Sequence, residues 1–143
     1  MKEVKEVRVG VVGFCLPTRF DEVEARRLIR SAYSEVVSLF SDCRIIVVSG
    51  LINVGIPAIA YNEACVHGWR TIGVACKRAT KHPLFPVNEK IIVGNEWGQE
   101  SPVFLALLNA MIRVGGGKQS LAETEAIKAK GFPVWEYDLP AIK

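Results

Sequence analysis

With 143 residues, the chain has the length of one compact domain with a sizeable core, and we expect a single domain over residues 1–143. Half of the residues are hydrophobic and 23% are charged, which is ordinary for a soluble globular protein. The formal net charge of +3 is mild and no long basic run is present, so nucleic acid is not expected as a partner.

The cysteines and the N-terminal residues bear on the compartment. No CxxC pair and no metal-type spacing is present, so we predict no metal site, no cofactor and reduced, buried thiols. Residues 1–6 are charged, and the apolar run after them is too interrupted for a signal peptide. No apolar segment reaches the ~20 residues of a membrane helix. We therefore expect a cytoplasmic protein without membrane contact. The cysteines are Cys15, Cys43, Cys65 and Cys76.

The first half of the chain alternates strands with helices. Residues 7–13 form a continuous valine-rich run, which is typical of a strand buried on both faces. Asp21, with Glu24 three residues later, predicts a capped helix that continues to Phe40. A second buried strand over residues 44–49 leads into a loop with two glycines and then another helix.

The second half repeats the alternation, which predicts an α/β fold: one doubly wound domain with a mostly parallel sheet of about six strands. The helix expected at residues 102–109 is apolar nearly all round, so we expect it to be buried in the domain or in a homo-oligomer contact. Strands are expected at residues 71–76, 90–93, 110–114 and 133–137, and a further helix at 120–130.

Three glycine-bearing loops follow strands, one at Gly13, one at Gly50 and Gly55, and one at residues 115–117. The carboxyl ends of parallel strands meet at one edge, where such sheets bind their ligands. In the third loop the glycines precede a helix, whose free N–H groups and dipole favour a phosphate or another anion. Two nucleotide motifs are absent: no GxGxxG follows the first strand, and Gln119 stands where a P-loop has Ser or Thr.

Residues 116–123, Gly-Gly-Lys-Gln-Ser-Leu-Ala-Glu, resemble the GGxGTxxE signature of the LOG (lonely guy) phosphoribohydrolases and their Smf/DprA relatives. Gln119 replaces a glycine of that signature and Ser120 replaces its threonine. Residues 9–13 are similar to the family's first strand and turn, 49–60 to its second glycine loop and helix, and 68–74 to the entry to its third strand. The resemblance implies a Rossmann-like domain that holds a nucleotide or phosphoribosyl group.

The resemblance also implies roles for single residues. Gly116, Gly117 and Ser120 would seat a phosphate, and Glu123 would be the catalytic carboxylate that helps to cleave an N-glycosidic bond. The family carries an arginine on the helix before the glycine loop, whereas residues 99–104 hold no arginine or lysine. The candidate ligand or phosphate contacts are Gly13, Phe14, Ser49, Gly50, Gly55, Gly115, Gly116, Gly117, Lys118, Gln119 and Ser120.

Several of these residues have a structural alternative. Ser120 and Glu123 fit an S-x-x-E capping box, which can coexist with a ligand role for Glu123. Lys118 is either exposed or a phosphate partner. Phe14 and Trp97 can stack on a base, but packing also explains each of them.

The sequence leaves three hypotheses for function. The leading one is a binding domain for a nucleotide or another phosphate-bearing small molecule, which acts as a sensor or carrier. The second is a phosphoribohydrolase-like enzyme that cleaves the base from a nucleoside 5′-monophosphate, which the missing arginine disfavours. The third is a non-catalytic homo-oligomeric assembly module whose glycine loops are only tight turns.

Overall fold

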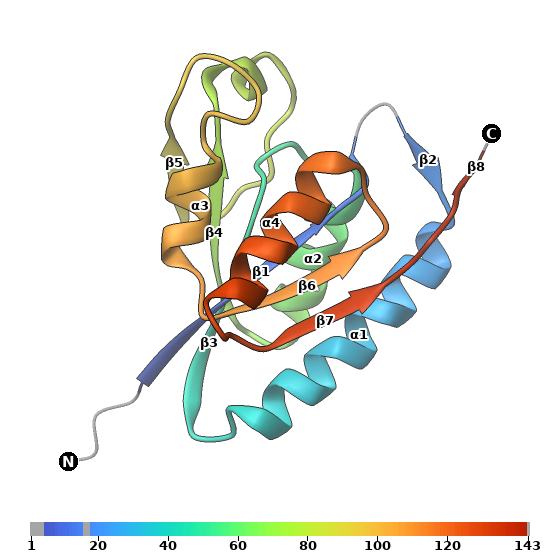
Figure 1. Ribbon diagram of the computed structural model, residues 1–143, viewed down its shortest axis with the longest axis vertical. Coiled ribbons are helices and arrows are strands. Elements are labelled where there is room, and N and C mark those ends of the chain that lie inside the picture. Colours follow the sequence, from blue (N-terminus) through green and yellow to red (C-terminus); the bar gives the residue numbers. More distant parts are fainter. Residues whose placement is uncertain (1–4, 16–17, 143) are drawn as a thin grey trace.

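A computed structural model describes residues 5–15 and 18–142 of the chain, and its centre is a sheet of six strands (Figure 1). The strand order is β5-β4-β3-β1-β6-β7, and every neighbouring pair is parallel. The prediction of about six mostly parallel strands is therefore confirmed, with a sheet that is parallel throughout. The strands are β1 (Lys5–Gly13), β3 (Cys43–Ser49), β4 (Arg70–Ala75), β5 (Glu89–Ile92), β6 (Ala110–Val114) and β7 (Val134–Tyr137).

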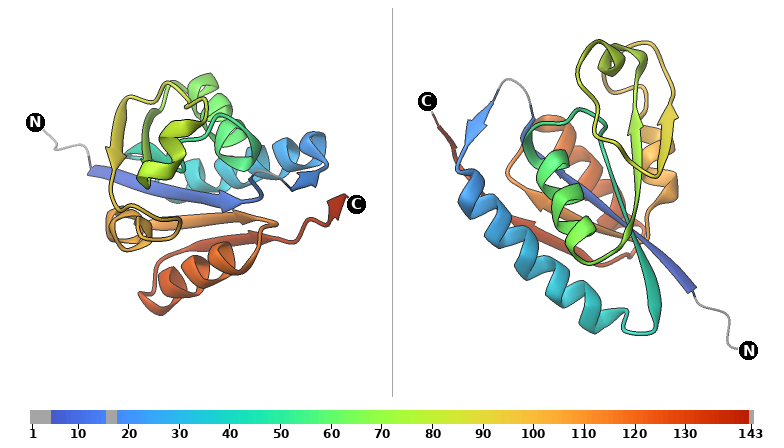
Figure 2. Two further views of the ribbon diagram at one scale, coloured as in Figure 1. Left: turned by 90° about the horizontal axis from the view of Figure 1, so that it is seen from above. Right: turned by 180° about the vertical axis from the view of Figure 1, so that it is seen from behind.

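Helices cover both faces of the sheet, as expected for a doubly wound domain (Figure 2). Helices α1 (Glu22–Leu39) and α2 (Gly55–Val66) pack on one face, and α3 (Ser101–Leu107) and α4 (Lys118–Ala129) pack on the other. The valine-rich strands fit this arrangement because side chains on both of their faces are buried. The remaining elements are the 3₁₀ helix η1 (Lys77–Lys81) and a small antiparallel pair, β2 (Arg19–Phe20) with β8 (Ala141–Ile142).

Strand order reverses beside β1. The chain steps from β1 through β3 and β4 to β5 in one direction, then returns through α3 to place β6 on the other side of β1. The three glycine loops therefore follow three adjacent strands, and they open on one edge of the sheet, as the sequence predicted. A crevice outside the carboxyl ends of the strands at such a reversal is where open α/β sheets bind ligands.

Helix α1 begins as predicted, because the Asp21 side chain accepts a hydrogen bond from the Glu24 N–H at 3.0 Å. The helix is also fixed to α2 by ion pairs. Arg26 Nη1 and Arg30 Nε lie 2.7 and 2.9 Å from the two carboxylate oxygens of Glu63, whose side chain is 4% exposed. Burial disfavours the ionised form of Glu63, but the hydrogen bonds from Arg30 and Arg26 outweigh it, so the Glu63 pKa is lowered.

Two predictions about helices were wrong. Helix α4 begins at Lys118 with Gly117 as its N-cap, so Ser120 lies inside the first turn and the predicted capping box with Glu123 does not form. The helix predicted at residues 102–109 ends at Leu107, and only Phe104 within it is buried. None of the helices described is long and apolar enough to cross a membrane.

Candidate functional site

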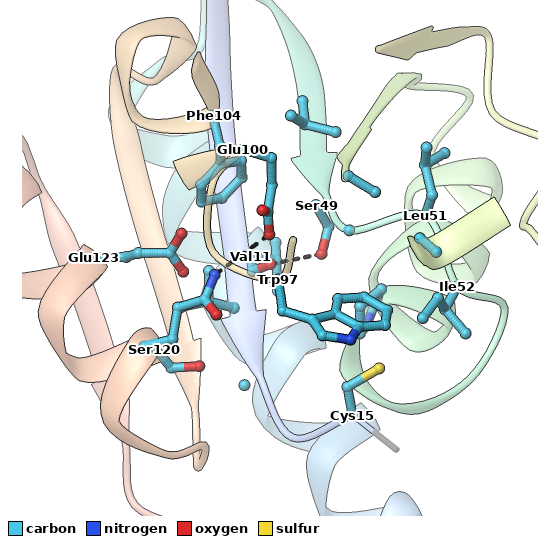
Figure 3. A pocket seen from close by; sticks show the side chains of 18 of the residues that line it. Val11, Cys15, Ser49, Leu51, Ile52, Trp97, Glu100, Phe104, Ser120 and Glu123 are labelled. Carbon is cyan, nitrogen blue, oxygen red and sulfur yellow. Dashed lines mark hydrogen bonds between the residues drawn. The ribbon is translucent and has the colours of Figure 1, made fainter. Parts of the chain in front are cut away.

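A cavity of about 360 Å³ opens at the carboxyl edge of the sheet, where the loops after β1, β3 and β6 meet (Figure 3). Its volume is within the range of small-molecule sites. The end of β1, residues 49 and 50 and the first turns of α4 line the cavity. Trp97, Glu100 and Phe104, from the segment around the start of α3, line it as well.

Close backbone packing explains the glycines at this edge. A Cβ atom on Gly13 would lie 2.1 Å from the carbonyl oxygen of Val114, so only glycine allows β1 and β6 to end side by side. Gly116 has a φ of +100°, which side chains rarely adopt, and this bend turns the chain from β6 into α4.

Polar side chains hold the strand ends and two of the three glycine loops at this edge. Ser49 Oγ donates to the Val11 carbonyl oxygen at 2.7 Å and joins the ends of β3 and β1. Tyr61 OH donates to the Gly50 carbonyl at 2.7 Å, and Arg113 Nη1 donates to the Gly115 carbonyl at 3.0 Å. Since the Gly50 and Gly115 carbonyls are bonded in this way, these two loops are held in place before any ligand binds.

Arg113 is a central strand residue that sequence reasoning placed in an apolar run. Its guanidinium also donates to Glu136 at 3.2 Å and to Asp138 at 2.8 Å. Burial opposes its charge, but these carboxylates outweigh the burial, so the Arg113 pKa is raised and the side chain stays charged. The buried arginine therefore ties the glycine loop to the end of β7.

The N-terminus of α4 borders the cavity, and its N-cap makes no side-chain hydrogen bond. Gly117, the N-cap, has no side chain to bond the first N–H groups, and the first i to i−4 bond runs from Leu121 N to Gly117 O at 3.1 Å. Residues 117–120 all line the cavity. Lys118 is exposed there, so its ammonium can add to the positive end of the helix dipole.

Two glutamates face this cavity from different elements, Glu123 from α4 and Glu100 from the segment before α3 (Figure 3). Glu123 is 7% exposed, and its Oε2 accepts a hydrogen bond from Ser101 Oγ at 2.8 Å. Burial raises the pKa of Glu123, hydrogen bonds from Ser101 and Gln119 oppose that rise, and the charge of Glu100 adds to it. Glu123 is thus a buried carboxyl group beside the helix N-terminus.

Glu100 is less well satisfied than Glu123. Its Oε1 receives only a 3.5 Å contact from Gln119 Nε2, at the limit of a hydrogen bond. Its Oε2 is buried and has no hydrogen-bond partner among the described residues. Sequence reasoning did not select Glu100, although the missing arginine at residues 99–104 marked this segment.

The structure brings most predicted site residues together. Of the candidate contacts, Gly13, Ser49, Gly50, Gly117, Lys118, Gln119 and Ser120 line the cavity, and so does Glu123. Phe14, Gly55, Gly115 and Gly116 are not among the lining residues. The Phe14 ring instead stacks on Phe20, with ring centres 5.6 Å apart, and its edge fills the space that a Cβ on Gly115 would need. Trp97 lines the cavity and is 53% exposed, so base stacking by Trp97 stays a prediction.

Sequence reasoning also missed the apolar lining. Leu51, Ile52, Val74 and Phe104 are apolar residues that sequence reasoning did not select as ligand contacts, yet they line the cavity. Within residues 5–15 and 18–142, no group of three or more His, Cys, Asp or Glu side chains is placed to hold a metal ion.

No protein-family model matches the sequence, and no curated protein matches it either. Among solved structures, the molybdenum cofactor carrier protein of Chlamydomonas reinhardtii matches with a TM-score of 0.67 and 21% identity, over 92% of this chain and 76% of that chain. The molybdenum cofactor binding protein of Rippkaea orientalis matches with a TM-score of 0.65 and 20% identity, over 95% and 77%. The structural-genomics target TM1055 matches with a TM-score of 0.65 and 19% identity, over 90% and 72%.

These similarities concern the fold alone, because all three sequence identities are under 25%. They cover nine tenths or more of this chain and confirm the Rossmann-like α/β fold that the sequence predicted.

Proposed function

We propose that this chain is a carrier or sensor domain that binds a phosphate-bearing small molecule in the cavity beside β1 and β6. The observation that carries the proposal is the uncapped N-terminus of α4, which lines that cavity together with Lys118. A phosphate placed there would accept hydrogen bonds from backbone N–H groups and meet the positive end of the helix dipole. A nucleotide or a phosphoribosyl compound carries such a group.

The fold comparison supports a carrier over an enzyme. Two of the similar structures are a carrier and a binding protein for the molybdenum cofactor, which is itself a phosphate-bearing small molecule. Lys118 is the one lysine or arginine among the lining residues described. No arginine is therefore available there to assist bond cleavage.

One observation favours the hydrolase as a second candidate. Glu123 is a buried carboxyl group with a raised pKa, which is common for catalytic acids and bases. It lies within the same cavity as the proposed phosphate seat, so it could stabilise an oxocarbenium-like centre or activate water.

Thermal unfolding with a ligand panel tests the proposal. The panel contains inorganic phosphate, pyrophosphate and the four common nucleoside monophosphates at millimolar concentration. A ligand present at 100 times its Kd should add about 2.7 kcal/mol to the free energy of unfolding. Lys118→Ala should weaken the shift, whereas Lys130→Ala, at the opposite end of α4, should leave it unchanged. A panel without any shift would refute the proposal and favour the assembly module.

A further inference from the structure

One side chain that lines the cavity is exposed to solvent although it is large and apolar. Trp97, from the loop before α3, lines the cavity and is 53% exposed. Of the exposed large apolar residues described, Trp97 is the one that lines this cavity. In Figure 3 its indole lies between Ser120, on the α4 side, and Ile52 on the other side. Packing in the core therefore does not account for a tryptophan at this position, since half of its apolar surface remains in water.

Side chains hold the backbone that carries Trp97. Gln99 Oε1 accepts hydrogen bonds from the Asn95 N–H at 2.7 Å and from the Glu96 N–H at 3.0 Å. Arg78 donates to both carboxylate oxygens of Glu96, at 2.6 and 3.1 Å. A bidentate pair of this kind fixes orientation as well as distance. The loop is thus ordered before a ligand binds, which lowers the entropy cost of a contact with the indole.

The indole of Trp97 is available for stacking. The centre of the His82 ring lies 6.3 Å from that of Trp97, and the two planes are tilted by 48°, so these rings are not stacked on each other. Aromatic rings prefer offset-stacked or edge-to-face arrangements, and each such pair is worth more than the area that it buries. A flat ring of a ligand in the cavity can therefore take the stacking position on the indole.

We propose that Trp97 stacks on an aromatic heterocycle of the ligand, so that the site takes a phosphate joined to a flat ring rather than a plain sugar phosphate. This role rests on the proposed function, because the phosphate seat at the start of α4 lines the same cavity. Stacking reads the face of a ring and tolerates different bases, so Trp97 selects for the presence of a ring and not for one base. Trp97 is thereby a specificity-determining residue at the cavity.

Calorimetry with the full chain compares ligands with and without a ring. Ribose 5-phosphate carries the phosphate and the sugar alone, and the four common nucleoside monophosphates add a base. Stacking on an aromatic side chain contributes roughly 5- to 100-fold in affinity per base. We therefore expect the nucleoside monophosphates to bind at least about fivefold more tightly than ribose 5-phosphate. Their binding should also change the tryptophan fluorescence of the protein.

Trp97→Leu is the matched variant, since it keeps an apolar side chain but removes the ring. It should reduce the preference for nucleoside monophosphates to less than about twofold and abolish the fluorescence change. It should bind ribose 5-phosphate as the wild type does, because that compound has no ring to stack. Trp69→Phe is the control: Trp69 packs against the core, stacks on His67 with ring centres 4.2 Å apart and does not line the cavity, so the full preference should remain. Circular dichroism shows whether each variant is folded.

The outcomes separate this role from the proposed function. Equal binding of ribose 5-phosphate and all four monophosphates would overturn the role of Trp97 and leave phosphate binding intact. A preference that persists in Trp97→Leu would overturn that role as well. If neither the sugar phosphate nor any monophosphate bound, the proposed function would fail, and the role of Trp97 would fail with it.

Discussion

Arg113→Met should destabilise the protein more than any exposed substitution, because it removes the side chain that holds the third glycine loop. The loss can be worked from the contacts of Arg113. The Gly115 carbonyl would be left buried without its donor, which costs about 1–3 kcal/mol. The pair with Glu136 adds about 1 kcal/mol at most, since that carboxylate also pairs with Lys128. Asp138 is 96% exposed and adds little.

Methionine keeps most of the apolar stem, so the expected total is about 2–4 kcal/mol. In a domain of this size, that loss lowers Tm by about 6–15 °C. Urea unfolding of the variant, compared with Arg78→Met at an exposed ion pair, measures the difference. If the two variants lost equal stability, the buried arginine would not be what holds the loop. The variant should also weaken ligand binding, because the start of α4 follows that loop directly.

Three further predictions concern packing, charge and assembly. Gly13→Ala should lower the free energy of unfolding by about 1–3 kcal/mol, because the added Cβ would collide with the Val114 backbone. In Gly117→Ala the added Cβ meets no atom within 4 Å, so this control variant should unfold in urea like the wild type. Glu63→Gln should destabilise the protein at pH 7. Since the Glu63 pKa is lowered on folding, the stabilisation by Glu63 is present above its unfolded pKa of about 4.3 and is lost as pH falls through its folded pKa. Thermal melts of the variant and the wild type should therefore converge as the pH is lowered. The half-buried Val103, Leu105 and Leu107 of α3 should be covered in a homo-oligomer, and light scattering that gives a monomer at micromolar concentration would contradict this.

The fold was largely predictable from the sequence because the strands are buried on both faces. A valine-rich run such as β1 needs helices on both sides, and alternating elements then leave few parallel topologies. The three glycine loops were predictable for the same reason, since parallel strands bring their carboxyl ends to one edge. The predicted ends of the sheet strands lie within two residues of the observed ends, and both ends of β6 match the prediction.

The site was less predictable where tertiary contacts override a local pattern. Ser120 and Glu123 match a capping box, but Gly116 bends the chain early enough for the helix to begin at Lys118, and Glu123 bonds Ser101 instead. Phe14 follows a strand at the ligand edge, yet Phe20 and Gly115 give it a packing site.

Two charged residues illustrate a second limit of sequence reasoning. Arg113 stands in an apolar strand, where a charge signals a buried pair, but its partners Glu136 and Asp138 are more than 20 residues away. Glu100 lies in a polar loop, where an acid carries no periodic signal, and only the fold shows that its oxygen is covered. Residues distant in the sequence pair with Arg113 and cover an oxygen of Glu100, and no motif in this chain records either contact.

Glu123→Gln distinguishes a binding domain from a hydrolase and also tests the electrostatics of the cavity. The pKa of Glu123 is raised on folding, chiefly by burial, so folding disfavours its ionised form. The cost of this ionisation to the stability of the fold is absent below the unfolded pKa of about 4.3. It grows as the pH rises from there to the folded pKa. Glutamine carries no such penalty and can keep a bond to Ser101, so the variant should gain stability over the wild type as pH rises from 4 to 8.

The same variant should bind nucleoside monophosphates nearly as well as the wild type, because the start of α4 is unchanged. Its catalytic outcome depends on the class of protein. A carrier or sensor releases no free base from any monophosphate during long incubation, either as wild type or as Glu123→Gln. We expect this result, because Lys118 is the one lysine or arginine among the lining residues described. If the protein is a hydrolase, the wild type releases free base and Glu123→Gln does not. Chromatography of the reaction mixture measures that release. Base release that continues undiminished in Glu123→Gln would exclude this carboxylate from the chemistry, whichever class the protein belongs to.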